Sequence, residues 1–134
     1  MPNRRRTGLV VLVITLGLAG CAAVDLGPSA ERTTLDPAWP TWFRLDWAVE
    51  AETRGTRRIS GYVHNDYGEA ASEVLLLTQA LDATGAVVHQ RIEWVMGKVP
   101  PLSRSWFEVR SLPPADRYRV TVWRFSLDQA GGWM

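Results

Sequence analysis

The sequence is poor in the side chains that form disulfides and hold metals. Cysteine occurs once, at Cys21, and histidine twice, at His64 and His89, in 134 residues. A single cysteine cannot form an intramolecular disulfide, so the folded part must be stable through its own core. His64 and Asp66 offer two metal ligands beside one turn but specify no third. We therefore expect no metal and no cofactor, and interpret the pair as a solvated turn.

An excess of charge of one sign is also absent. Arg4, Arg5 and Arg6 are three of the 15 basic residues, which leaves 12 basic against 14 acidic residues after residue 20, a net charge of −2. Nucleic-acid binding requires a concentrated basic face, so we expect no nucleic-acid partner. No Gly-x-Ser-x-Gly elbow or comparable signature marks a catalytic group. We expect a non-catalytic binding or structural module and not an enzyme, with no catalytic residue to assign. The alternatives are a glycan-binding module and, less favoured, a small hydrolase or metal-binding protein.

No apolar run is long enough to cross a membrane as a helix. The longest covers residues 9–18, and a helix over residues 7–20 would measure about 21 Å against a hydrocarbon core of about 30 Å. Arginines followed by a short apolar run are typical of an export signal. We therefore predict a cleaved signal peptide over residues 1–20.

The residues Leu18-Ala19-Gly20-Cys21 follow that run directly. They resemble the lipobox of bacterial lipoproteins, which implies that Cys21 is lipidated and becomes the mature N-terminus. A diacylglyceryl group, often with a third chain such as palmitate, gives a lasting membrane anchor where one chain gives a marginal one. The absence of Asp beside Cys21 resembles the sorting pattern for the outer membrane facing the periplasm, which we favour over the inner membrane. The alternative for Cys21 is an ordinary buried or free thiol.

The segment after Cys21 predicts a tether. Residues 22–38 show no helical or alternating period and contain Gly27, Pro28 and Pro37. A flexible coil of this length has an end-to-end distance of about 23 Å. We therefore divide the chain into a signal peptide at 1–20, a lipidated N-terminus and tether at 21–38, and a folded domain at 39–134.

The folded domain alternates apolar and polar residues with a period of two. The pattern predicts strands over about 43–50, 59–64, 74–81, 87–96, 105–110 and 117–127, separated by turn residues. The run 74–81 is apolar nearly throughout, which indicates a central strand. Six or seven strands with turns between them and no long helical segment indicate an all-β protein, an immunoglobulin-like antiparallel β-sandwich.

Three short motifs stand out in the predicted domain: the strand end at 59–65, the hairpin within 74–88, and Pro100-Pro101 followed by the strand at 105–109. They resemble the FxLYD-type domains, small immunoglobulin-like sandwiches of bacterial and archaeal envelope proteins. Positions 78, 80 and 81 depart from the motif that names the family, and Leu102 stands where the family has glycine. The resemblance implies an extracytoplasmic sandwich and no common chemistry.

Seven tryptophans are the unusual feature of the composition. Trp47 shares the parity of the apolar residues of its strand and is predicted to be core, whereas Trp94, Trp106 and Trp123 have the opposite parity. We hypothesise a partner-binding surface of Trp94, Trp123 and Arg119, because aromatic residues and arginine are enriched at interfaces. The partner would be an envelope protein or a glycan, in addition to the membrane that holds the lipid anchor. The alternative is that sheet edges, the loop 97–104 or the tail 130–134 cover these rings.

Overall fold

The computed structural model describes residues 23–25 and 31–128, and this part of the chain is built almost entirely from β-strands. The strands are β1 (Ala23–Asp25), β2 (Phe43–Ala51), β3 (Arg57–Asn65), β4 (Ala71–Leu81), β5 (Val87–Trp94), β6 (Arg104–Leu112) and β7 (Arg117–Leu127), and one 3₁₀ turn, η1 (Trp39–Thr41), precedes β2. The six expected strands are confirmed, each within about three residues of its expected bounds. The predicted signal peptide and Cys21 lie outside the described residues. None of the described segments is a helix that is both long and apolar enough to span a bilayer.

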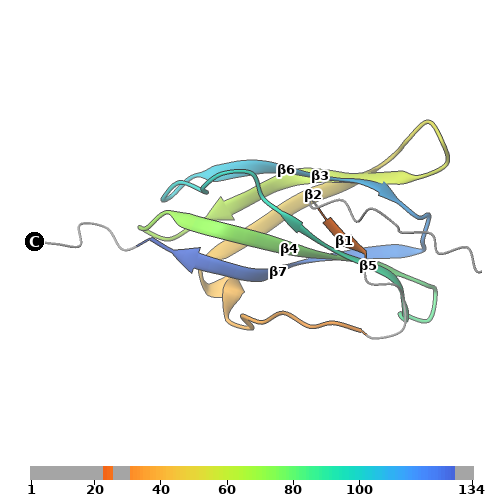
Figure 1. The fold of residues 1–134 in the computed structure, drawn as a ribbon, viewed down its shortest axis with the longest axis horizontal. Helices are drawn as coiled ribbons and strands as arrows, with labels where there is room; N and C mark the ends of the chain where they lie inside the picture. Colours follow the sequence, from red (N-terminus) through yellow and green to blue (C-terminus); the bar gives the residue numbers. More distant parts are fainter. Residues whose placement is uncertain (1–22, 26–30, 129–134) are drawn as a thin grey trace, which may run out of the picture.

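The strands form two antiparallel sheets that face one another (Figure 1). One sheet has the order β1-β5-β4-β7 and the other the order β2-β3-β6. The chain changes sheet after β1, after β3, after β5 and after β6, and such crossings between two sheets are typical of immunoglobulin-like sandwiches. Strand β4 lies between β5 and β7, so its nearly continuous apolar sequence is explained by burial on both faces. The predicted β-sandwich is therefore confirmed.

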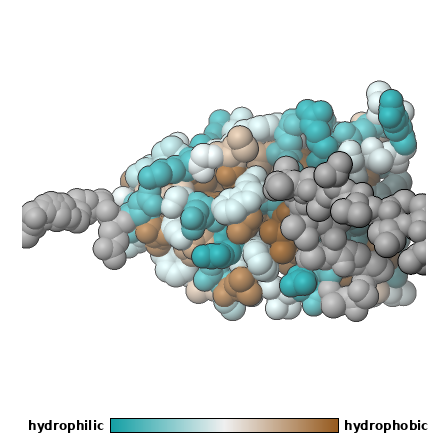
Figure 2. Space-filling view, in the orientation of Figure 1, coloured by the Kyte–Doolittle hydropathy of each residue, from teal (hydrophilic) through white to brown (hydrophobic). Residues whose placement is uncertain are grey.

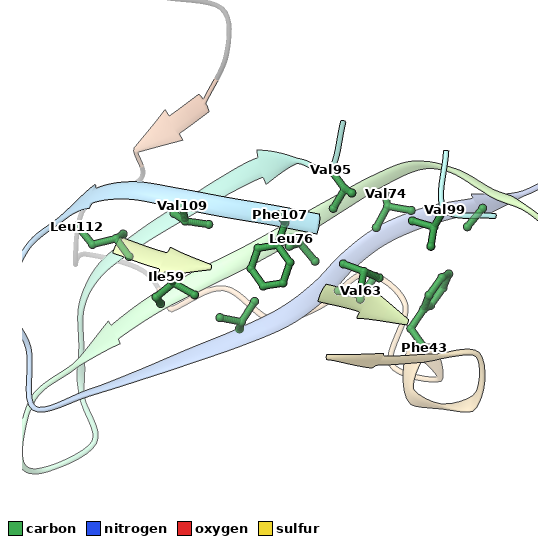
Figure 3. Packing of buried hydrophobic residues seen from close by; sticks show 13 residues of the cluster. Phe43, Ile59, Val63, Val74, Leu76, Val95, Val99, Phe107, Val109 and Leu112 are labelled. Atoms are coloured by element: carbon green, nitrogen blue, oxygen red, sulfur yellow. The ribbon is translucent and has the colours of Figure 1, made fainter. Parts of the chain in front are cut away.

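The core fills the space between the two sheets (Figure 3). Ile59 and Val63 of β3 and Phe107 of β6 meet Leu76 of β4 and Val122 of β7, and all five are at most 4% exposed. The expected alternation is confirmed for Val120, which is also buried. Trp47 is half-buried and packs against this cluster from edge strand β2. Val49, which has the same parity, is 40% exposed, so the core does not extend to the end of β2.

Three irregularities change which residues of a strand face the core. The pairing of β4 with β7 shifts on either side of Leu75, and Glu73 has a φ of 51°. A shift of one residue moves every following side chain to the opposite face. Ala71 and Leu127 therefore point into the sandwich, although strict alternation places both on the outer face. A similar shift between β3 and β6 brings Leu112 into the core.

Leu76 provides a direct test of this packing. It is 2% exposed at the centre of the core, and Leu76→Ala should lower the free energy of unfolding by about 2–5 kcal/mol through lost apolar contacts and the remaining cavity. Val88→Ala is the matched control, because Val88 is 41% exposed on β5. Denaturant melts of both variants measure the difference. Equal effects at the two sites would show that the parity assigned to β4 is wrong.

Candidate functional site

The outer face of the β5-β4-β7 sheet is crossed by the segment that precedes η1. We call residues 31–36 the strap. Thr34 Oγ1 donates to the Val122 carbonyl at 2.6 Å, and the Leu35 N–H donates to the Trp123 carbonyl at 3.0 Å. Beneath the strap, β4 presents Leu77 and Gln79 on the same outer face. The strap therefore reaches the edge strand β7 and hydrogen-bonds to two of its backbone carbonyls.

Two buried glutamines hold the strap. Gln79 and Gln90 are at most 1% exposed, although they lie on the outer face of the sheet. Gln79 Nε2 donates to the Arg32 carbonyl at 2.9 Å and to Gln90 Oε1 at 3.1 Å, and Gln90 Oε1 also accepts the Arg32 N–H at 2.9 Å. Burying an amide costs free energy unless it is hydrogen-bonded. The backbone of Arg32 supplies hydrogen bonds to both buried glutamines, so the strap and the glutamines stabilise one another.

The strap corrects the expectation of a free tether over residues 22–38. Residues 31–36 make backbone and side-chain hydrogen bonds to β4, β5 and β7. These contacts could not be predicted from the sequence, because the strap has neither of the two periodicities that mark helices and strands. The nearest signal was a pair of amides, Gln79 and Gln90, on strands that are otherwise largely apolar. A stable fragment should therefore begin at residue 31 and not at residue 39.

Thr34 is the strap residue with the clearest expected effect. Its Oγ1 donates to the Val122 carbonyl and accepts the Asp36 N–H at 3.0 Å, so Thr34→Val should cost about 1 kcal/mol of stability. Thr33→Val is the control, since Thr33 is exposed. Chemical denaturation of the two variants decides the point. A destabilisation shared by both would attribute the effect to the substitution type and not to the hydrogen bonds.

The three hypothesised binding residues do not form one free surface. Trp123 is half-buried and packs with Leu75, Leu77 and Ile92 on the outer face. Arg119 Nε donates to Gln79 Oε1 at 2.8 Å, and its guanidinium pairs with Glu31 of the strap at 2.8 Å. Trp94, in contrast, is 50% exposed. Strands β5 and β7 belong to the same sheet, but the strap lies beside Trp123 and Arg119 on its outer face.

Trp94 instead belongs to a groove between β5 of one sheet and β6 of the other. This aromatic groove has a volume of about 660 Å³ and is lined by Glu93, Trp94, Met96, Trp106, Phe107 and Glu108. Met96 is 86% exposed and Trp106 is 49% exposed, whereas Phe107 belongs to the core. The face of the molecule in Figure 2 shows apolar patches separated by hydrophilic residues, outside the part drawn in grey. The aromatic groove thus brings exposed aromatic and aliphatic side chains of the described residues together around one concave feature.

Trp106 is held in place by its neighbours. It lies opposite Tyr62 in the β3–β6 register, and the two rings meet nearly edge to face, with centroids 5.0 Å apart at 74°. Arg104 lies over the Tyr62 ring, with its guanidinium carbon 4.0 Å from the ring centre. This geometry combines an aromatic pair with a cation–π contact. Trp106 is therefore exposed in a fixed orientation.

The carboxylate of Glu108 borders the aromatic groove and is ionised at neutral pH. Its pKa is lowered chiefly by the hydrogen bond from Arg110, whose Nε lies 2.9 Å from Oε2, and to a smaller degree by the positive charge of Arg58 and a hydrogen bond from Trp106. Since Arg110 accompanies it, Glu108 adds little net charge to the groove. The arrangement offers apolar contact and hydrogen bonding, without a paired acid and base.

The two histidines lie apart from this groove. His64 Nε2 is 3.4 Å from Asp46 Oδ2 on the outer face of β2 and β3, while Asp66 pairs with Arg44 at 3.6 Å. His64 and Asp66, considered above as two metal ligands, therefore contact different residues and not one another. Within residues 23–25 and 31–128 there is no group of three or more side chains arranged to hold a metal.

The fold defines the chain as a small β-sandwich protein. Comparison with protein-family models, with curated proteins and with solved structures finds no match to this chain. The resemblances to the lipobox and to FxLYD-type domains therefore remain predictions from the residues that carry them.

Proposed function

We propose that this chain is an envelope lipoprotein, anchored through acyl chains on Cys21, whose sandwich acts as a non-catalytic binding module. The anchor is supported by the leader and by Leu18-Ala19-Gly20-Cys21. The binding role is supported by one observation above all: Trp94, Met96 and Trp106 are exposed together around a groove. Exposed apolar side chains that gather in one place mark interaction sites, whereas isolated ones do not.

A glycan-binding module is the second candidate, favoured by Glu93 and Glu108 beside the aromatic rings. A glycan that stacks along a strand face binds best to aromatic rings that lie in one plane. The 74° angle between Tyr62 and Trp106 gives a stepped surface instead of a flat platform. We therefore rank the glycan below an apolar occupant of the groove.

Hydroxyl-radical footprinting in native envelopes tests the binding role. The full protein is oxidised once in the envelope and once after purification, and the products are mapped by mass spectrometry. We expect Trp94, Met96 and Trp106 to be protected in the envelope, because an occupant covers the groove. Val49 and Val88, each about 40% exposed, are internal references that should react alike in both samples. Equal oxidation of the groove residues in the two samples would refute a binding role for the groove.

A further inference from the structure

The path from the predicted anchor to the sandwich is very short. Strand β1 begins at Ala23, two residues after Cys21, and Ala23 pairs with Glu93 of β5. Two residues of extended chain span about 7 Å at most. Because the pairing is antiparallel, with Asp25 opposite Arg91, the chain enters β1 from the Trp94 end of β5. An anchor on Cys21 therefore holds the lipid surface close to the aromatic groove.

Exposed apolar side chains concentrate at this same end of the sandwich. Among the described residues, eight large hydrophobic side chains are exposed, and five of them lie around the connection from β5 to β6: Tyr67, Trp94, Met96, Leu102 and Trp106. Met96 and Leu102, in the loop itself, are 86% and 75% exposed. The Leu102 N–H donates to the Tyr67 carbonyl at 3.0 Å, which joins this loop to the β3–β4 turn. The exposed residues thus form one end of the molecule and are not scattered over it.

We propose that this end of the sandwich, the aromatic groove together with the β5–β6 loop, lies in the headgroup region of the membrane that carries the anchor. The inference rests on the proposed acylation of Cys21 and names the occupant of the groove as the lipid surface. The acyl chains and the groove then act as two membrane contacts on one rigid body, so the domain is oriented on the bilayer and does not swing freely above it.

The chemistry of the groove fits a membrane interface. Tryptophan and tyrosine concentrate at the headgroup level, where the rings meet acyl chains and their polar atoms stay hydrated. Met96 and Leu102 are the most exposed of these apolar side chains. Arg104 lies over Tyr62 and forms no ion pair with a carboxylate among the described residues, so a lipid phosphate is a suitable counter-ion for it.

A spin label at position 96 measures this orientation directly. The mature, acylated full-length protein is reconstituted into vesicles of phosphatidylethanolamine and phosphatidylglycerol. Because acylation consumes the thiol of Cys21, Met96→Cys supplies the one thiol for labelling. Val88→Cys is the matched control, since Val88 is exposed on β5, six residues and about 20 Å before Trp94. Electron paramagnetic resonance then compares collisions of each label with oxygen, which enters bilayers, and with a water-soluble nickel chelate.

The expected result is a label at position 96 that collides several-fold less with the nickel chelate, and more with oxygen, than the label at position 88. Equal accessibility of the two labels to the nickel chelate would overturn the proposal. Shielding at position 96 from both reagents in native envelopes, with full nickel accessibility in the vesicles, would also overturn it and assign the groove to a protein partner. The intact mass of the same sample distinguishes failure of the proposed function from failure of this inference. A free thiol on Cys21 refutes the proposed function. An acylated Cys21 with a water-exposed position 96 refutes this inference alone.

Discussion

Gly61→Ala is expected to cost about 4 kcal/mol or more of folding free energy, a large share of the stability of a domain of this size. Gly61 lies on β3 opposite Trp47 of β2, and the backbones approach so closely that a Cβ at Gly61 would lie 1.9 Å from the Asp46 carbonyl oxygen and 2.6 Å from the Trp47 Cα. Both obstacles are backbone atoms, so a side chain cannot simply rotate away. The β2–β3 pairing would have to open.

Gly68→Ala is the matched control for this prediction. A Cβ at Gly68 would meet no atom within 4 Å, so its effect should stay within about 0.5 kcal/mol. Urea melts of the wild type and both variants, followed by tryptophan fluorescence, provide the comparison. A wild-type melting curve for Gly61→Ala would mean that β2 does not approach β3 as closely as the structure places it.

The second large effect is expected at Cys21. Cys21→Ser should abolish lipid attachment and leave the precursor unprocessed, because a hydroxyl does not replace the thiol that is alkylated. The protein would then lose its acyl anchor, and with it the cooperation of two or three chains that makes anchoring durable. Ala22→Ser is the control, because it makes a comparably small change at the next residue and leaves the thiol in place. Gel mobility and detergent-phase partitioning distinguish the lipidated from the unlipidated form, and a Cys21→Ser protein that still partitions with detergent after processing would contradict the assignment.

The strands could be predicted from the sequence because their alternation comes directly from burial of one face. The run that became β4 was recognised as central because its side chains are apolar on both faces, and Leu76 and Val120 are buried as expected. The bulges could not be predicted, since one extra residue on β7 beside Trp123 reverses the faces of all that follow. Phe125 packs edge to face with Phe43 only because of that reversal, with ring centroids 4.8 Å apart.

The candidate site was predicted in part. Trp94 was identified as an outward residue by parity alone, and its exposure agrees. Trp106 has outward parity as well, but its position beside Trp94 and Met96 could not be predicted, because the three side chains come from β6, β5 and a loop, and only the tertiary structure brings them together. Arg119 was misjudged as a free surface cation for the same kind of reason: its partners Gln79 and Glu31 are 40 and 88 residues distant in sequence.

The central claim is that the mature protein begins at an acylated Cys21 and presents the sandwich from that anchor. Mass spectrometry of the N-terminal peptide of protein purified from envelopes tests it most directly. We expect a peptide that starts at Cys21, with a diacylglyceryl group on its sulfur and no trace of residues 1–20. A mature N-terminus at any other residue, or a peptide that contains Cys21 with an unmodified thiol, would contradict it.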